Sequence, residues 1–279
     1  MRRHNLLVVD YDYFFPEPEW DDPQGMLYDW GHKEAPFFIE GIWGGRAEGF
    51  LMNNLPLPDL TGEELTFWDR FTITPDAKLW YADSNSCAVN PSITGKRQPF
   101  DTVWLYDAHH DSGYDGLESA SLRRQRINVI LSEGRFYCDN WTTLYAAACG
   151  SLIYVRYPAW KPWAMEAEPQ PLFDIDRKVD DGTSPDVVFD RVFVCRSGAW
   201  VPPWHNIDAR FEQFVERAPV KKKVDLTPGG LTRRSFDLEH VKINARRSAM
   251  LLEAYKISRQ TGEDEATVIG RLKAQMESA

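Results

Sequence analysis

The chain has 279 residues, of which 43% are apolar and 27% are charged, and its mean hydropathy is -0.46. That composition is typical of a globular protein and excludes a fibrous or wholly disordered chain. The formal net charge of -10 opposes general affinity for nucleic acid, because such affinity depends on Lys and Arg side chains that neutralise phosphates. No apolar run approaches the ~18 residues of a membrane span, and the run after the basic N-terminus is too short for a signal peptide. We therefore expect a cytoplasmic protein that binds neither membranes nor nucleic acid.

The N-terminal part begins with a strand expected over residues 5–10, where an aliphatic run is followed at once by acidic residues. Such a run is typical of a strand buried on both faces of a sheet. Residues 14–60 are rich in Pro, Gly and Trp without a sustained period, which predicts an aromatic-rich insertion of loops and short irregular strands, with a lid over a site as one role. Thr61-Gly62-Glu63-Glu64 has the form of a capping box and predicts a short helix as far as Asp69.

Strands and helices alternate through the middle of the chain. The further strands expected are apolar runs that end at turns, namely 78–82, 102–106, 152–155, 187–189 and 192–195, the last two as a pair or as one broken strand. The helices expected are 141–149, begun by Asp139-Asn140 and stopped by Gly150, and one from Asn206 or Asp208 to Arg217. Residues 117–131 fit a helix and a strand equally well.

This alternation predicts an α/β fold with a mainly parallel sheet covered by helices on both faces. The α/β domain is expected over residues 1–218, followed by a charged linker containing Pro and Gly over 219–236. Residues 237–279 are expected to add a C-terminal helical hairpin, with helices near 237–260 and 264–277. That hairpin would pack on the domain or on a second copy of the chain, which makes homo-oligomerisation an open expectation.

Two acidic motifs follow two of the expected strands. The strand at 102–106 runs into Asp107-Ala108-His109-His110-Asp111, and the strand at 5–10 runs into Asp10-Tyr11-Asp12. In parallel sheets, ligands gather at the carboxyl ends of the strands. If these two strands are neighbours, four carboxylates and one imidazole meet at one place.

Carboxylate oxygens combined with imidazole suit Mn²⁺, Fe²⁺ or Zn²⁺, whereas sites made only of oxygen favour Mg²⁺ or Ca²⁺. The predicted ligands are Asp10, Asp12, Asp107, His109 and Asp111. They would hold one or two ions, with Mn²⁺ favoured and Zn²⁺ or Fe²⁺ as alternatives. The four cysteines lack metal-ligand spacing and are expected to be reduced.

The residues Asp107-Ala108-His109-His110-Asp111 resemble the Asp-Ala-His-x-Asp strand end of the arginase and deacetylase superfamily of metallohydrolases, which cleave C–N bonds. Asp10-Tyr11-Asp12-Tyr13-Phe14 resembles that superfamily's second ligand strand, in the form found in a poorly characterised arginase-like branch. The resemblance covers roughly 5–15 and 100–217. It implies a three-layer fold in which Asp107 and Asp10 are shared or bridging ligands, Asp111 completes the set of one metal, and His109 and Asp12 that of the other.

The chain departs from the superfamily in two respects. The two ligand strands occur in reversed order, which implies a circularly permuted sheet. The Gly-Gly-Asp-His segment that supplies a further histidine ligand in arginases is missing, so a fifth or sixth ligand must come from elsewhere.

Further candidates lie close to the acidic motifs. His110 and His205 are candidate general acids or bases, with a buried or surface structural role as the alternative for each. Asn140 and Trp141 are candidates for substrate binding, although Asn140 at a helix start also fits a simple cap.

The predicted function is a metal-dependent hydrolase that cleaves an amide, amidine or guanidine-type C–N bond of a small molecule. One alternative is phosphoryl transfer, because Leu6 to Asp12 also resembles the nucleophile strand of haloacid-dehalogenase-like phosphatases. In that group a Thr or Val usually stands where this chain has Phe14. The other alternative is a metal-binding or scaffold protein without turnover.

Overall fold

The computed structural model of the protein describes residues 4–16, 36–94, 100–113, 129, 134, 136–161 and 170–277. These residues belong to two compact units. Unit 1 comprises Met1–Glu34 and Pro58–Arg234, and unit 2 comprises Ala35–Leu57 and Ser235–Ala279. Most of the expected ambiguous segment 117–131 and residues 17–35 of the expected insertion lie outside the described residues.

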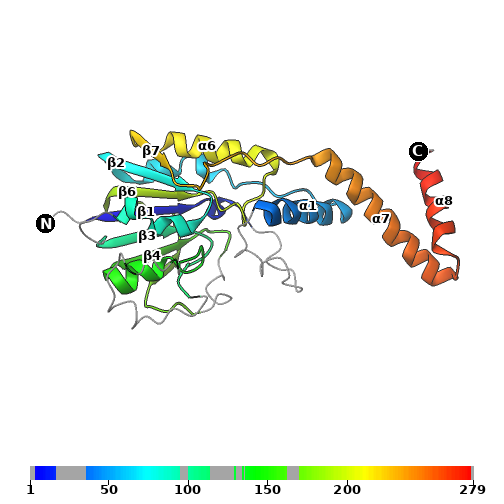
Figure 1. Ribbon diagram of the computed structural model, residues 1–279, viewed down its shortest axis with the longest axis horizontal. Helices are drawn as coiled ribbons and strands as arrows, with labels where there is room; N and C mark the ends of the chain where they lie inside the picture. Colours follow the sequence, from blue (N-terminus) through cyan, green and yellow to red (C-terminus); the bar gives the residue numbers. More distant parts are fainter. Residues whose placement is uncertain are drawn as a thin grey trace. The chain divides into compact units, whose positions relative to one another are not determined.

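Unit 1 is built on a seven-stranded sheet in the order β5-β4-β3-β1-β6-β2-β7 (Figure 1). Its strands are β1 (Asn5–Asp10), β2 (Thr72–Ala82), β3 (Thr102–Tyr106), β4 (Leu152–Tyr157), β5 (Asp176–Val179), β6 (Val188–Cys195) and β7 (Lys222–Asp225). Every neighbouring pair is parallel, so the carboxyl ends of all seven strands lie at one edge of the sheet. The prediction of an α/β fold with a mainly parallel sheet is confirmed.

The central strand β1 lies between β3 and β6, with Val9 beside Tyr106 and Asp10 beside Cys195. All six of its residues are buried, which is why its sequence is a continuous aliphatic run rather than an alternating one. The two strands that carry the acidic motifs are therefore direct neighbours. Their acidic ends emerge side by side.

Both faces of the sheet are covered. On one face, strand side chains pack against the π-helical turn η5 (Leu144–Cys149) and the residues just before it. This hydrophobic core includes Leu6, Val8, Val103, Leu105, Phe193, Trp141 and Tyr145. Successive strand residues point to opposite faces, so Tyr106 faces away from Leu105. Tyr106 packs edge-on against Tyr13 and Phe67, beside the aromatic face of α6 (Ile207–Arg217).

Several local expectations need correction. The capping box does not start an α-helix: Gly62 is left-handed, and two 3-10 turns follow, η2 (Glu63–Leu65) and η3 (Phe67–Arg70). Of the two alternatives for 187–189 and 192–195, the structure has a single strand, β6, without the expected break. The expected linker 219–236 contains β7, which pairs with β2 at the sheet's edge.

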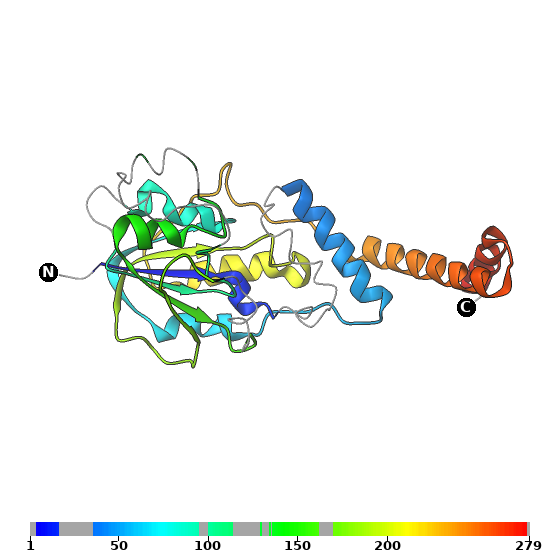
Figure 2. The ribbon, with the colours of Figure 1, turned by 90° about the horizontal axis from the view of Figure 1, so that it is seen from below.

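Unit 2 consists of three helices, α1 (Pro36–Met52), α7 (Leu238–Thr261) and α8 (Glu265–Glu277). The hairpin of α7 and α8, separated at Gly262, is confirmed, and α7 also packs against α1 (Figure 2). Helix α1 lies within the insertion expected to be irregular, so that prediction was wrong for 36–52. No helix among the described residues has both the length and the apolar character needed to cross a membrane.

Candidate metal centre

The candidate centre is formed where β1 and β3 end. Asp10 is the last residue of β1, Asp12 lies in the 3-10 turn η1 (Tyr11–Phe14), and Asp107 directly follows β3. All three side chains are buried. Two of these carboxylates also stabilise the turns in which they lie. Asp10 accepts a hydrogen bond from the backbone N–H of Asp12, and Asp107 accepts one from the backbone N–H of His109.

Asp12, Asp107 and His109 each present one ligand atom, and these atoms lie within 4.8 Å of one another. The Nδ1 atom of His109 is 3.1 Å from Oδ2 of Asp12 and 3.6 Å from Oδ1 of Asp107. The other oxygen of Asp12 accepts a hydrogen bond from the backbone N–H of Ala108, at 3.2 Å. Two carboxylates and one imidazole are a donor set that suits Mn²⁺, Fe²⁺ or Zn²⁺, so the residues present fit a divalent cation.

The other two predicted ligands lie beside this group and contact a residue that the sequence had not indicated. Asn85, in the 3-10 turn η4 (Asn85–Val89) after β2, places Nδ2 at 2.5 Å from Asp10, 2.9 Å from Asp111 and 3.3 Å from Asp107. Asp111 adopts a left-handed backbone conformation, with φ of 49°, and also accepts a hydrogen bond from the indole of Trp141 at 2.5 Å. All five predicted metal ligands therefore belong to one connected cluster.

The electrostatics of this cluster favour a bound cation. Burial raises the pKa of Asp10 and of Asp107 well above the usual range, and the charges of neighbouring carboxylates raise both further. Burial likewise raises the pKa of Asp111 to about 8, against the opposing effects of His109 and the Trp141 hydrogen bond. Four close carboxylates repel one another in a poorly solvated place, and a divalent cation removes that repulsion.

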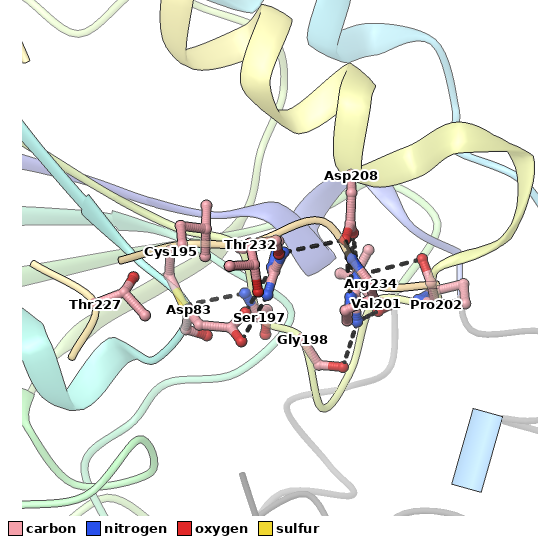
Figure 3. Close-up of polar contacts among 12 residues, drawn as sticks. Asp83, Cys195, Ser197, Gly198, Val201, Pro202, Asp208, Thr227, Thr232 and Arg234 are labelled. Atoms are coloured by element: carbon pink, nitrogen blue, oxygen red, sulfur yellow. Dashed lines mark hydrogen bonds and ion pairs between the residues drawn. The ribbon is translucent and has the colours of Figure 1, made fainter. Parts of the chain in front are cut away.

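A network of ion pairs and hydrogen bonds holds the loop after β6 (Figure 3). Arg196 donates two hydrogen bonds to Asp83, at 2.7 and 2.8 Å, and one to Asp208 at 3.0 Å. Asp208 also binds Arg234, whose guanidinium donates to the backbone carbonyls of Gly198 and Val201. A Cβ at Gly198 would lie 2.6 Å from the Asp83 carboxylate, so a larger residue would have to displace this carboxylate from its pairing with Arg196.

The network ties together two loops that reach the carboxylates. Asp83 lies two residues before Asn85 in the chain, and Arg196 directly precedes Ser197, whose side chain hydrogen-bonds to Asp10. Ser197 is itself left-handed, with φ of 56°. The Arg196–Asp83 pair thus fixes the positions from which Asn85 and Ser197 approach the site.

The remaining predicted site residues occupy three different environments. His110 is fully buried, and its Nδ1 accepts a hydrogen bond from the backbone N–H of Ser112 at 3.1 Å, which favours a structural role. Asn140 is also buried and accepts a hydrogen bond from the backbone N–H of Tyr137, so its side chain caps a turn. Trp141 holds Asp111. His205, in contrast, is exposed and left-handed, with φ of 54°, and its role as a general acid or base stays a prediction.

Sequence reasoning missed Asn85, Ser197 and Trp200. The ring of Trp200 packs on that of His109 with centroids 4.6 Å apart, and both side chains are partly exposed, so they mark the solvent side of the cluster. One signal was available in the sequence: Asn85 and Ser197 both follow strand ends, as the acidic motifs do. Comparison of the chain with protein-family models, with characterised proteins and with solved structures found no match.

Proposed function

We propose that the protein is a metal-dependent hydrolase of a small molecule, acting on an amide, amidine or guanidine-type C–N bond. The observation that carries the proposal is the meeting of Asp12, Asp107 and His109 within 4.8 Å at the ends of two neighbouring parallel strands. The bond type comes from the resemblance of the two acidic motifs to the arginase and deacetylase superfamily. The resemblance and the geometry support the same ligands independently.

The chain's own residues hold and orient the reacting groups. Asp12, Asp107 and His109 would bind the cation, with His109 in its neutral form and Nδ1 facing the metal. Once bound, a divalent cation acidifies a water molecule and polarises the carbonyl or amidine carbon of the substrate. A substrate would approach from the side of His109 and Trp200, which are partly exposed, because the carboxylates themselves are buried.

Metal content tests the first half of this proposal. We expect purified protein, with Mn²⁺ added back where needed, to hold at least one ion per chain. Elemental mass spectrometry of the purified protein measures this metal content. Substitution His109→Ala should abolish most of this binding, because it removes one of the three converging ligands. His240→Ala is the matched control, since His240 is exposed on α7 and its ring contacts Asn244 of the same helix.

Activity tests the second half. Panels of amides, amidines and guanidines are expected to give turnover that chelation abolishes and Mn²⁺ restores. A phosphatase panel with Mg²⁺ separates the phosphoryl-transfer alternative, which requires Asp10 as a nucleophile although Asp10 is engaged by Asn85 and by Ser197. Wild-type protein that binds less than about half an ion per chain would refute the metallohydrolase and favour a scaffold.

A further inference from the structure

Asn85 is the residue whose position the proposed function does not yet explain. Its side chain is buried, with 3% exposed, and lies among three carboxylates. Among the described residues its Oδ1 has no hydrogen-bond partner. A buried amide oxygen without a partner costs free energy, so its place next to an acidic cluster calls for a reason.

The contacts of Nδ2 are also more numerous than an amide can serve. An amide nitrogen has two hydrogens, whereas Oδ2 atoms of Asp10, Asp107 and Asp111 converge on it at 2.5, 3.3 and 2.9 Å. Three carboxylate oxygens around one point form a coordination shell for a cation rather than for a hydrogen-bond donor. Nδ2 itself occupies that point, so an ion could take it only if the Asn85 side chain withdrew and the three oxygens closed to metal–oxygen distances of roughly 2.0–2.2 Å.

We propose that Asn85 is itself a metal ligand, which supplies its side-chain oxygen to an ion shared with Asp10, Asp107 and Asp111. This inference rests on the proposed function and supplies the ligand that the chain lacks because it has no Gly-Gly-Asp-His segment. Withdrawal of the side chain, with rotation of the amide about its last side-chain bond to exchange Oδ1 and Nδ2, would turn Oδ1 toward such an ion. Without an ion, Nδ2 separates the carboxylates; with one, Oδ1 faces the ion.

The ligand type fits the charge of this position. Three carboxylates already bring more negative charge than one divalent ion carries, so a neutral oxygen donor completes the shell without adding repulsion. Amide oxygens are established ligands of hard divalent cations, and Mn²⁺ accepts both oxygen and imidazole donors. The second group, made of Asp12, Asp107 and His109, would share Asp107 with this ion.

A cysteine at position 85 tests whether this side chain reaches the metal. We expect the variant Asn85→Cys loaded with Co²⁺ to show a near-ultraviolet thiolate-to-cobalt charge-transfer band, because such a band requires a direct sulfur–metal bond. Wild-type protein supplies the background of its four native cysteines, none of which forms a disulfide in the described part of the chain. Asn90→Cys is the matched control, since Asn90 ends the same turn and its side chain caps Ser92.

Affinity provides a second and independent measurement, in case the cysteine variant does not fold. Loss of residues that merely support a metal ligand typically lowers affinity 10–100-fold, so Asn85→Ala should weaken Mn²⁺ binding at least about tenfold in calorimetric titrations. Asn85→Asp keeps an oxygen at the same place, and its added negative charge attracts the cation although it adds repulsion to the metal-free cluster, so this variant should bind Mn²⁺ at least as tightly as the wild type. Asn90→Ala should bind as the wild type does.

The outcomes separate this inference from the function on which it rests. Wild-type protein that binds no Mn²⁺ or Co²⁺ would overturn both. Wild-type binding together with an Asn85→Ala variant that binds as tightly or more tightly would overturn only the role of Asn85, because a mere separator of carboxylates hinders the ion. Absence of the charge-transfer band in folded, Co²⁺-loaded Asn85→Cys protein would likewise overturn only the role of Asn85 as a ligand.

Discussion

Asp107 is surrounded by more negative charge than any single donor near it can balance. Asp107 accepts a 2.7 Å hydrogen bond from the backbone N–H of His109 and a longer one from the Asn85 amide. Burial raises its pKa most, and the charges of Asp12, Asp111 and Asp10 raise it further. Its carboxylate is therefore unfavourable in the folded protein unless a cation is bound. Asp107 should therefore lower the stability of the metal-free protein and be required for binding of the metal.

The substitution Asp107→Asn separates these two effects. In the presence of a chelator the variant should unfold at the same temperature as the wild type or a higher one, because one buried charge is gone. With Mn²⁺ at about 100 times its dissociation constant, the wild type should gain about 2.7 kcal/mol and the variant much less. Differential scanning calorimetry with and without Mn²⁺ measures both. Equal stabilisation of the two proteins by Mn²⁺ would remove Asp107 from the ligand set.

Asp111 gives the cation-free protein a defined pH dependence. Its pKa is about 8 when folded, against the usual 3.8, so the folded state binds more protons than the unfolded state between these values. Stability should therefore fall as pH rises from about 4 to about 8, and the raised pKa values of Asp10 and Asp107 add to this fall. Urea unfolding in EDTA across this range measures the slope, and Asp111→Asn should make it shallower, with Asp10 and Asp107 leaving a residual slope. A wild-type protein that becomes more stable through this interval would contradict the prediction.

The elements were predicted where the local sequence and the tertiary environment agree. β1 was found because a strand buried on both faces needs an aliphatic run, and the meeting of Asp10 with Asp107 followed from parallel pairing. α1 was missed because its four glycines, Gly41, Gly44, Gly45 and Gly49, each disfavour a helix by about 1 kcal/mol relative to Ala. Its packing with α7 is not readable from local sequence.

β7 and Asn85 were missed for other reasons. β7 is an edge strand that carries Lys222 and Lys223. Lysines protect sheet edges from pairing with other chains. The strand therefore has the composition of a charged linker and was predicted as one. Asn85 follows β2 at the same sheet edge as the acids, but one Asn in a polar loop carries no ligand pattern. The role of Asn85 depends on its contacts with Asp10, Asp107 and Asp111, which lie at or after the ends of β1 and β3.

The link between α6 and the loop after β6 depends on one carboxylate, Asp208. It lies 6% exposed between Arg196 and Arg234, and although burial raises its pKa, the two guanidinium groups outweigh this effect and lower it. Asp208→Ala would remove the carboxylate that Arg234 binds and would leave Arg196 paired with Asp83. We expect a loss of about 3–5 kcal/mol in the free energy of unfolding, measured with urea.

The matched control lies on the same helix. Glu212→Ala removes an acid that pairs with Arg233 at 2.6 Å, but both of these side chains are exposed to solvent. Its effect on stability should be small, because solvent and salt screen an exposed pair. Similar losses from Asp208→Ala and Glu212→Ala would show that the buried network does not hold the loop.

At the scale of the whole molecule, all the proposed ligands belong to unit 1, whereas α1, α7 and α8 form unit 2 with buried positions of its own, such as Ala254 and Val268. A ligand stabilises the part of a protein whose unfolding destroys its site. Saturating Mn²⁺ should therefore slow amide hydrogen exchange in β1, β3 and β6 and leave exchange in α7 and α8 unchanged. Hydrogen exchange followed by mass spectrometry resolves these segments. Equal protection of both units would mean that they unfold as one, and no protection of β1 and β3 would count against a cation at their ends.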